Sequence, residues 1–332
     1  MEPIIECVPN FSEGQNNETI KAIASAIRKI KGVRLLHVDS GFAANRTVYT
    51  FVGNPLSVLE AAFQAIKVAA ELIDMRSHKG EHPRMGACDV CPLIPVSGIS
   101  MNEVIDLSHQ LGKRVGEELN IPVYLYEKSA QQPERVQLAN VRKGEYEGLP
   151  LKMSLPHWQP DYGPNILNPK SGATILGARN FLIAYNFNLN TSNITIARSI
   201  AEQIRESGKY IGKNEQGKKL YTPGKFKALK SIGWFIKDFG IAQVSCNFSD
   251  YQLTPLHLVH EMVKLLAAEH DCKVTGAELI GLIPKEALLM AGQFYEPNQT
   301  EEDKLIATAI KELGLSDLNE FRPNERIIEF ML

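Results

Sequence analysis

The order of secondary-structure signals repeats along this chain, and this repeat constrains the fold more than any other feature. The first half shows strand and helix patterns in the order β-α-β-β-α-β, ending at the apolar run 90–96. The second half shows the same order between residues 181 and 283. This order is typical of the ferredoxin-like, or split βαβ, arrangement. The sequence therefore predicts an α+β protein of two ferredoxin-like α/β sandwich subdomains, each a mainly antiparallel sheet covered by helices.

Hydrophobic periodicity and cap residues give the individual elements. Short apolar runs indicate strands, and apolar residues three and four positions apart indicate helices. Asn54 and Pro55 mark the start of one helix, and Gly240 separates the strands of a hairpin. The predicted strands are 4–8, 33–39, 47–52, 90–96, 123–126, 181–188, 229–239, 241–248 and 274–283, and the predicted helices are 20–30, 55–73, 100–119, 133–143, 194–204, 254–266 and 301–313.

The segment between the two repeats has a different composition. Residues 144–172 are rich in proline, glycine and asparagine. A long irregular stretch inside a compact chain is usually functional or a linker, and a length of 332 residues favours two domains. We therefore place the subdomains at residues 1–178 and 179–332, and we expect a ligand cleft between them.

Composition argues against several classes of function. With 36 basic and 38 acidic residues the net charge is −2, so neither nucleic acid nor an anionic membrane is expected as a partner. The odd count of five cysteines argues against a disulfide scaffold. No signal peptide is evident at the N-terminus, and no apolar run approaches the ~18 residues of a membrane span. We expect a cytoplasmic protein.

The loop 76–86 is the strongest candidate for a functional site. It holds two histidines, two arginines, a lysine and a glutamate, together with two glycines and a proline that keep it out of regular structure. His82 is followed by Pro83, which favours an extended backbone at the histidine. A titratable base among fixed positive charges, including Lys79 and Arg84, suits an anionic substrate that needs proton transfer. The alternative is a solvated, charged surface turn.

A zinc site is a weaker interpretation of the same region. His78, His82, Cys88 and Cys91 are zinc-ligand residue types, but the cysteines lie in a predicted strand, where positions three apart point to opposite faces. Structural zinc sites prefer compact ligand pairs. We therefore expect no metal, and we expect both cysteines to pack in the core.

Polar residues at the ends of predicted strands form a second group of candidates. Asp39 ends one strand, Arg46 follows the turn after it, and Asn10 lies at the end of the first strand. Turn chemistry explains an Asp-Ser-Gly sequence equally well. The functional interpretation is a rim at which Arg46 binds a carboxylate. Nucleotide binding is not indicated, because the loop 163–172 lacks the phosphate-loop pattern.

Four segments of the chain resemble one known family, that of glutamate formimidoyltransferase. They are CVPNFSEG (7–14), HKGEHPRMGACDVCPLIPV (78–96), SGATILGARNFLIAYN (171–186) and ERIIEF (325–330). The resemblance covers essentially the whole chain and extends to the formiminotransferase part of formimidoyltransferase-cyclodeaminase. It implies two α/β subdomains and a homodimer, which agrees with the repeated order of elements.

The resemblance also implies a reaction and a set of site residues. The formimino group of N-formimino-L-glutamate would pass to N5 of tetrahydrofolate, giving 5-formiminotetrahydrofolate and L-glutamate, a step of histidine degradation and one-carbon metabolism. His82 would be the catalytic acid and base, tetrahydrofolate the co-substrate, and a separate cyclodeaminase would take the product. The implied folate-binding loop consists of Gly163, Pro164, Asn165, Ile166, Leu167, Asn168, Pro169, Lys170, Ser171 and Gly172.

Both substrates carry carboxylates, and basic side chains are expected to hold them. Our candidates are Arg46, Lys79, Arg84 and Arg179, with Asn10 and Asp39 at the rim. Two other functions remain open. One is a folate-binding relative that acts on 5-formyltetrahydrofolate, and the other is a non-enzymatic module that uses the charged loop for docking. A zinc hydrolase is a more distant third.

Overall fold

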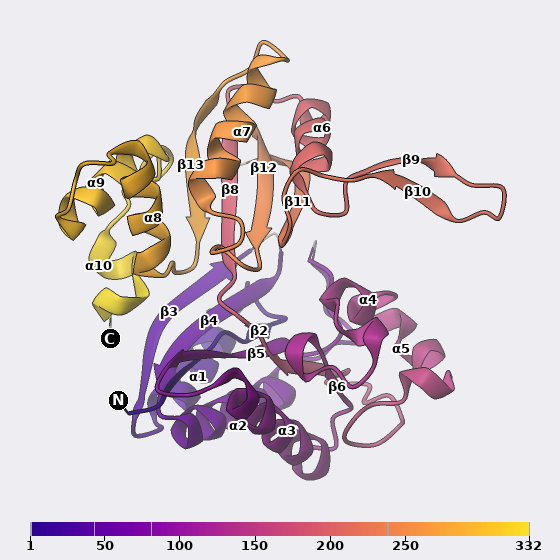
Figure 1. Ribbon diagram of the computed structural model, residues 1–332. Coiled ribbons are helices and arrows are strands. Elements are labelled where there is room, and N and C mark those ends of the chain that lie inside the picture. The colour runs from indigo at the N-terminus through magenta and orange to yellow at the C-terminus, as the bar shows by residue number, and fades with distance from the viewer. Residues whose placement is uncertain (1, 43, 81, 238, 332) are drawn as a thin grey trace. The chain divides into compact units, whose positions relative to one another are not determined.

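The chain forms two compact units, Met1–Asn180 and Phe181–Leu332 (Figure 1). They come from a computed structural model that describes residues 2–42, 44–80, 82–237 and 239–331. Both units mix helices with strands, so the chain belongs to the α+β class. No helix in these described ranges is both long and apolar enough to cross a membrane.

A seven-stranded sheet forms the centre of the first unit. Its strands are β1 (Ile4–Cys7), β2 (Asn10–Phe11), β3 (Val33–Gly41), β4 (Arg46–Gly53), β5 (Cys88–Ser97), β6 (Val123–Leu125) and β7 (Thr174–Ala178). They follow the order β1-β4-β2-β5-β7-β6, and β3 pairs with the outer side of β4. The predicted strand 4–8 corresponds to β1, and β2 lies beyond Pro9 in a stretch that was expected to be a loop. The pairings of β7 with β5 and β6 are parallel, and the others are antiparallel.

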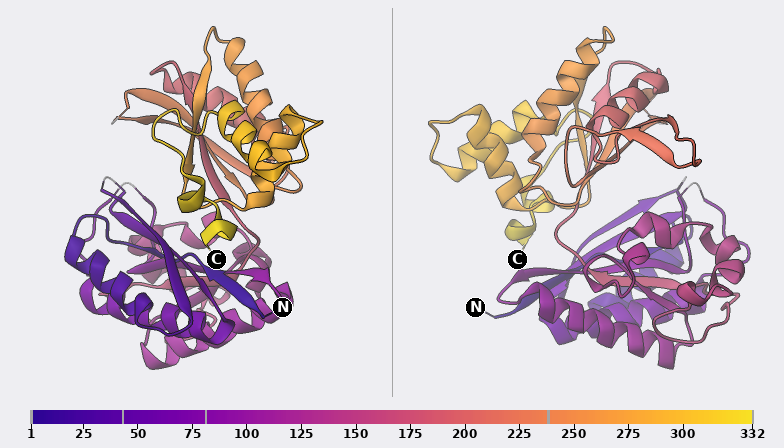
Figure 2. Two further views of the ribbon diagram at one scale, coloured as in Figure 1. Left: turned by 90° about the vertical axis from the view of Figure 1, so that its left-hand side faces the viewer. Right: turned by 45° about the vertical axis from the view of Figure 1, so that its right-hand side comes forward.

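Three long helices cover one face of this sheet. They are α1 (Asn17–Arg28), α2 (Pro55–Leu72) and α3 (Met101–Glu118), and they lie side by side (Figure 2). Side-chain caps define their starts: Asn16 and Asn54 accept bonds from the first turns of α1 and α2, and Ser100 forms a capping box with Glu103. Their apolar stripes and one face of the sheet enclose the main core of the unit.

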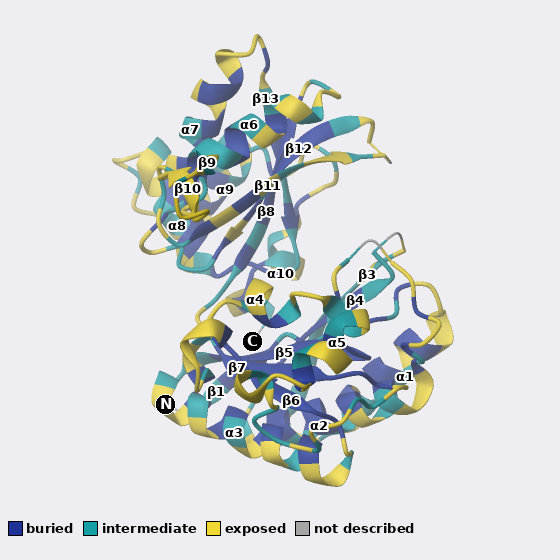
Figure 3. Cartoon of the chain, turned by 90° about the vertical axis from the view of Figure 1, so that its right-hand side faces the viewer, coloured by how far each residue is buried: buried dark blue, intermediate teal, exposed yellow. Residues whose placement is uncertain are grey.

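Short helices cover part of the opposite face of the sheet. They are α4 (Leu138–Arg142) and α5 (Glu145–Met153). In β6 the side chains alternate, so that Val123 and Leu125 face the core under the long helices, while Tyr124 faces the cluster under α4 and α5. Figure 3 shows β5 and β7 as buried strands between these two layers. Burial on both faces explains why these strands are mostly apolar.

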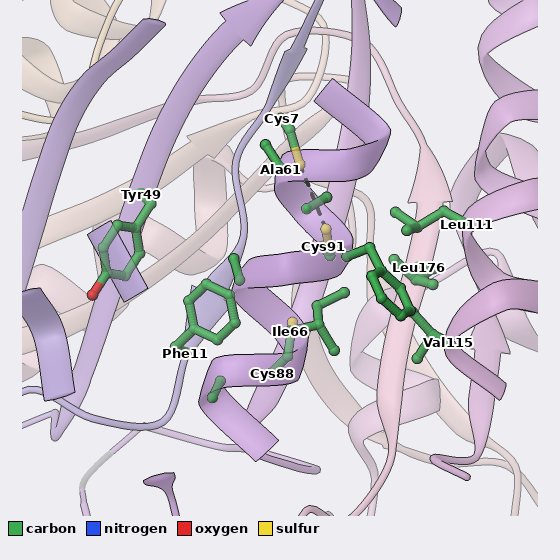
Figure 4. Packing of buried hydrophobic residues seen from close by; sticks show 14 of the residues in the cluster. Cys7, Phe11, Tyr49, Ala61, Ile66, Cys88, Cys91, Leu111, Val115 and Leu176 are labelled. Carbon is green, nitrogen blue, oxygen red and sulfur yellow. Dashed lines mark hydrogen bonds between the residues drawn. The ribbon is translucent and has the colours of Figure 1, made fainter. Parts of the chain in front are cut away.

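Three cysteines contribute to the core beneath α2. Cys7, Cys88 and Cys91 are buried beside Phe11 and Ile66 (Figure 4). The sulfur atoms of Cys7 and Cys91 lie 3.5 Å apart, and all five cysteines of the chain are free thiols. Cysteine in such surroundings behaves as a small hydrophobic side chain.

The second unit contains a four-stranded antiparallel sheet. Its strands are β8 (Ile183–Leu189), β11 (Leu229–Ile236), β12 (Ile241–Phe248) and β13 (Val274–Ile280), in the order β11-β12-β8-β13. Helices α6 (Ile194–Ile204) and α7 (Leu256–Ala268) pack on one face, where Tyr185 and Phe187 of β8 contribute to the core. The connections read β-α-β-β-α-β, with a two-stranded hairpin inserted after α6.

Several elements were not predicted from the sequence. The hairpin β9 (Lys209–Lys213) and β10 (Lys219–Thr222) projects from the second unit in Figure 1. The strand β7 and the helices α5, α8 (Lys285–Tyr295) and α10 (Pro323–Arg326) were also missed, while α9 (Glu302–Glu312) was expected. The helix expected at 133–143 is a single 3₁₀ turn (Pro133–Arg135) followed by α4. The strand expected at 274–283 ends at Ile280, because Gly281 takes a positive φ.

Candidate active site

The loop that carries His82 is held by the turn between β3 and β4. Asn45 donates from Nδ2 to the carbonyl of Lys79 at 2.8 Å, and its own carbonyl bonds Nε2 of His78 at 2.9 Å. A Cβ at Gly80 would lie 2.3 Å from the carbonyl oxygen of Ala44, so only glycine allows this approach. Glu81 is outside the described residues. The loop is therefore ordered by specific contacts on the side that leads to His82.

Three of the residues proposed from sequence, His82, Arg46 and Asn10, are linked by hydrogen bonds. One nitrogen of Arg46, Nη1, lies 2.8 Å from Nε2 of His82 and donates to Oδ1 of Asn10, also at 2.8 Å. Asn10 is anchored in turn by a bond from its Nδ2 to the carbonyl of Val8 at 3.1 Å. The strands β2 and β4 are hydrogen-bonded neighbours, with Asn10 opposite Val48, and this pairing brings Asn10 and Arg46 together.

These contacts determine the protonation of His82. A guanidinium can only donate hydrogen bonds, so Nε2 must accept, and the proton of the neutral ring lies on Nδ1. Burial of the ring is the main cause that lowers the pKa of His82 to about 3, and the charges of Arg46 and Arg142 add to it, while the backbone of Pro83 acts in the opposite direction. Nδ1 is buried and meets no hydrogen-bond partner in the described part of the chain.

A buried ion pair lies next to this group and was not predicted. Asp89, only 1% exposed, binds the guanidinium of Arg142 through one carboxylate oxygen and accepts from the amide of Met85 at 2.9 Å through the other. Asp89 and Asp39 favour the charged form of Arg46, but burial and the charge of Arg142 outweigh them and lower the pKa of Arg46. This ion pair could not be predicted from local sequence patterns, because 53 residues separate Asp89 from Arg142 along the chain.

Arg84 is also buried, but its charge is already paired. Its guanidinium bonds Glu145 at 3.0 Å and Glu147 at 2.6 Å, and Nε donates to Nδ1 of His78 at 3.3 Å. The bond to Glu147 is the main cause that raises the pKa of Arg84. Two carboxylates of the protein therefore occupy the positions at which a substrate carboxylate would bind.

The other residues proposed at the rim do not contact His82. Lys79 is exposed and borders a hollow of about 360 Å³ that Glu13, Asn45 and His78 also line, but His82 does not. Asp39 is half-buried in β3, opposite Val48. Arg179 follows β7 and donates to the carbonyl of Asn180 at 2.8 Å.

The segment 163–172 is joined to the His82 loop at its C-terminal end. The backbone amide of Ala87 donates to the carbonyl of Ser171 at 2.8 Å. The backbone amide of Ala173 donates to the carbonyl of Met85 at 3.1 Å. Gly172 and Gly86 face each other in a β-bridge. The middle of the segment is exposed, and Ile166 is 68% exposed. A ligand bound to this segment would therefore be bound by a loop attached to the backbone next to Arg84.

Within the described ranges, no group of three or more His, Cys, Asp or Glu side chains could hold a metal ion. His78 bonds Asn45 and Arg84, and the cysteines lie in the core. The contact of His82 with Arg46 places a neutral imidazole beside a cation, an arrangement that can take part in proton transfer.

Comparison with known proteins identifies the class. Residues 4–179 match the formiminotransferase domain, N-terminal subdomain, and residues 184–332 match the formiminotransferase domain. Glutamate formimidoyltransferase of Streptococcus pyogenes is 44% identical over 89% of this chain and 94% of its own length. The protein of the same name in Thermoplasma acidophilum is 42% identical over 88% of this chain and 92% of its own length.

Longer proteins match as well. Formimidoyltransferase-cyclodeaminase of Gallus gallus is 48% identical over all of this chain, which spans 60% of the length of that relative. The two microbial proteins named as formimidoyltransferases each match this chain over more than 90% of their own length. The chain belongs to the formiminotransferase family.

Proposed function

We propose that this chain is a glutamate formimidoyltransferase. It transfers the formimino group from N-formimino-L-glutamate to N5 of tetrahydrofolate and releases 5-formiminotetrahydrofolate and L-glutamate. The observation that carries the proposal is a neutral histidine, His82, placed beside a cation and next to the loop 163–172. The names of the two microbial relatives support the same reaction.

The reaction needs one proton to move between two nitrogens. N5 of the folate adds to the carbon of the formimino group and forms a C–N bond, which gives a tetrahedral intermediate. His82 accepts the proton that N5 loses and returns it to the nitrogen of glutamate as the original C–N bond breaks. One imidazole can perform both steps, and such acid–base help contributes roughly 10²–10⁴ in rate. Holding both substrates in one orientation supplies much of the remaining acceleration.

The binding roles follow from which groups are available. Residues 163–172 are proposed to bind the folate, because their backbone is partly exposed and joined to the His82 loop. Arg46 is the first choice for a substrate carboxylate, and Lys79 and Arg179 are further candidates for the folate tail. Arg84 is the weakest candidate, because Glu145 and Glu147 already neutralise it.

The remaining parts of the proposal concern organisation. We propose two ferredoxin-like subdomains, 1–178 and 179–332, in a cytoplasmic homodimer. The two family models and the repeated order of elements support the division into two subdomains.

The test is a transfer assay with two alternative donors. Purified protein is incubated with tetrahydrofolate and N-formimino-L-glutamate, and release of glutamate is measured with and without the folate. A second reaction supplies 5-formyltetrahydrofolate and glutamate. Folate-dependent release of glutamate from the formimino donor supports the proposal. Turnover of 5-formyltetrahydrofolate alone would instead support the alternative function, a folate-binding relative that acts on this compound. No turnover of either donor would refute the proposed function.

A further inference from the structure

Arg46 is a half-buried cation whose hydrogen bonds use only part of its guanidinium. Arg46 forms two side-chain hydrogen bonds, to Asn10 and to His82, and both come from the same nitrogen, Nη1. Within the described residues, Nε and Nη2 have no hydrogen-bond partner and the guanidinium forms no ion pair. An arginine normally offers five N–H donors in a planar fork, and its Nε–Nη2 edge matches the two oxygens of a carboxylate. This edge is the unused part of Arg46.

The contrast with Arg84 shows that the open edge is particular to Arg46. Arg84 bonds Glu147 with both Nη1 and Nη2, at 2.8 and 2.6 Å. It also bonds Glu145 and His78, so its donors face carboxylates and an imidazole of the protein itself. Arg84 is buried and paired with two carboxylates of the chain, whereas Arg46 is half-buried and forms no ion pair among the described residues.

The position of Arg46 also keeps His82 from acting as a base. A base must present a lone pair to the proton that it removes. The lone pair on Nε2 points at Nη1 of Arg46, and Nδ1 carries the ring proton. The charges of Arg46 and Arg142 further disfavour the imidazolium that the reaction would form. The carboxylates of Asp89 and Asp39 act on Arg46, where burial and the charge of Arg142 outweigh them.

We propose that Arg46 is a carboxylate-operated gate on His82. In the free protein it occupies Nε2 of the histidine. When a carboxylate of the glutamate portion of the substrate binds the open Nε–Nη2 edge, the guanidinium is drawn off the imidazole, and its charge is balanced. His82 is then released as a base only in the complex that needs it. This inference deepens the proposed function and rests on it for the identity of the substrate.

The gate has a functional advantage in the reaction. A histidine that becomes basic only beside bound substrate stays neutral in the free protein. Nε2 then receives the proton of N5 after the folate attacks, and the same atom returns it to glutamate. As glutamate leaves, its carboxylate leaves Arg46, and the guanidinium can bond Nε2 again. No additional proton donor or acceptor is required.

The experiment follows the ring nitrogens of His82 by ¹⁵N NMR, with L-glutamate as the probe. In the free protein we expect an Nδ1–H tautomer that does not titrate between pH 5 and 8, where the carboxylates of glutamate stay ionised. With glutamate present, the pKa of His82 should rise by about 2–3 from its value of about 3, so that the ring begins to titrate in this window. Glutaric diamide, which has no carboxylate, should leave the ring unchanged.

Two variants separate the gate from a general effect of charge. Arg46→Met should raise the pKa of His82 in the free protein, although burial and Arg142 still lower it, and should abolish any further response to glutamate. Arg76→Met is the matched control, because the side chain of Arg76 is 63% exposed and pairs with Asp74. The control should behave as wild type. If Arg46→Met does not fold, the wild-type titration with and without glutamate still decides the question.

The outcomes also separate the gate from the proposed reaction. A wild-type His82 that does not respond at any soluble concentration of glutamate overturns the gate, even if the transfer assay succeeds. A response to glutamate that persists in Arg46→Met overturns it as well. If the transfer assay fails while glutamate still moves the pKa of His82 through Arg46, the gate stands and the proposed reaction falls.

Discussion

The contact between the segment 163–172 and the His82 loop should depend on the absence of a side chain at Gly172. This residue has φ +67°, and a Cβ there would lie 2.2 Å from the carbonyl oxygen of Met85 and 2.8 Å from Cα of Gly86. Both are backbone atoms of a buried segment, so they cannot rotate away. Gly172→Ala should therefore force the two segments apart.

The expected cost has two parts. An L-residue in the left-handed region costs about 1–2 kcal/mol. Separation of the segments would weaken two backbone hydrogen bonds, from Ala173 to Met85 and from Ala87 to Ser171, each worth about 0.5–1.5 kcal/mol. We expect Gly172→Ala to lower the free energy of unfolding of the first unit by about 2–5 kcal/mol.

The assay is urea unfolding followed by tryptophan fluorescence. The chain has two tryptophans, so a Trp234→Phe background leaves Trp158 as the reporter of the first unit. Gly148→Ala is the control, because no heavy atom lies within 4 Å of its added Cβ and alanine favours a helix by about 0.5–1 kcal/mol. A loss below about 1 kcal/mol for Gly172→Ala, or an equal loss for both variants, would refute this reasoning.

Two further predictions concern buried charge. Arg135→Met should lower the free energy of unfolding reported by Trp158 by about 3–5 kcal/mol, because it leaves the charge of Asp161 buried and unpaired. In the native pair the side chains of Arg135 and Asp161 are only 4% and 5% exposed. An unchanged urea midpoint would contradict this prediction. Burial lowers the pKa of His260 to about 4 in the folded protein, whereas the unfolded value is about 6.5. Because the unfolded chain binds this proton first, the stability that the neutral His260 contributes is present above pH 6.5 and is lost as the pH falls towards 4. In His260→Leu, unfolding followed by Trp234 fluorescence should lose less stability over this window than in wild type, and parallel curves would contradict the assignment.

Much of the fold could be predicted because periodicity and caps are local signals. The helices α1, α2 and α3 each carry an apolar stripe and a capping residue, and the expected helix 55–73 differs from α2 by one residue at its C-terminal end. The strand β7 was missed because it lies within a stretch of glycines and pairs with partners distant in sequence. The helix α5 contains Pro150 and a glycine, which oppose a helix locally, so tertiary packing of Leu149 and Met153 stabilises it.

The candidate site was less accessible to sequence reasoning. His82 could be selected from the residues around it, and Arg46 and Asn10 from their places at strand ends. Their meeting depends on the pairing of β2 with β4, which no local pattern encodes. For the same reason, Arg84 resembled a free cation in the sequence, although Glu145 and Glu147 lie 61 and 63 residues away along the chain. The ion pair of Asp89 with Arg142 gave no sequence signal at all.

The turnover of His82→Ala with N-formimino-L-glutamate and tetrahydrofolate tests the central claim most directly. Its control is His270→Ala, which removes an exposed histidine of the second unit, and folate binding is measured for both variants by equilibrium titration. We predict that His82→Ala keeps folate binding and loses at least about a hundredfold in kcat, while His270→Ala matches wild type. A folded His82→Ala protein with nearly intact turnover would contradict the role of His82.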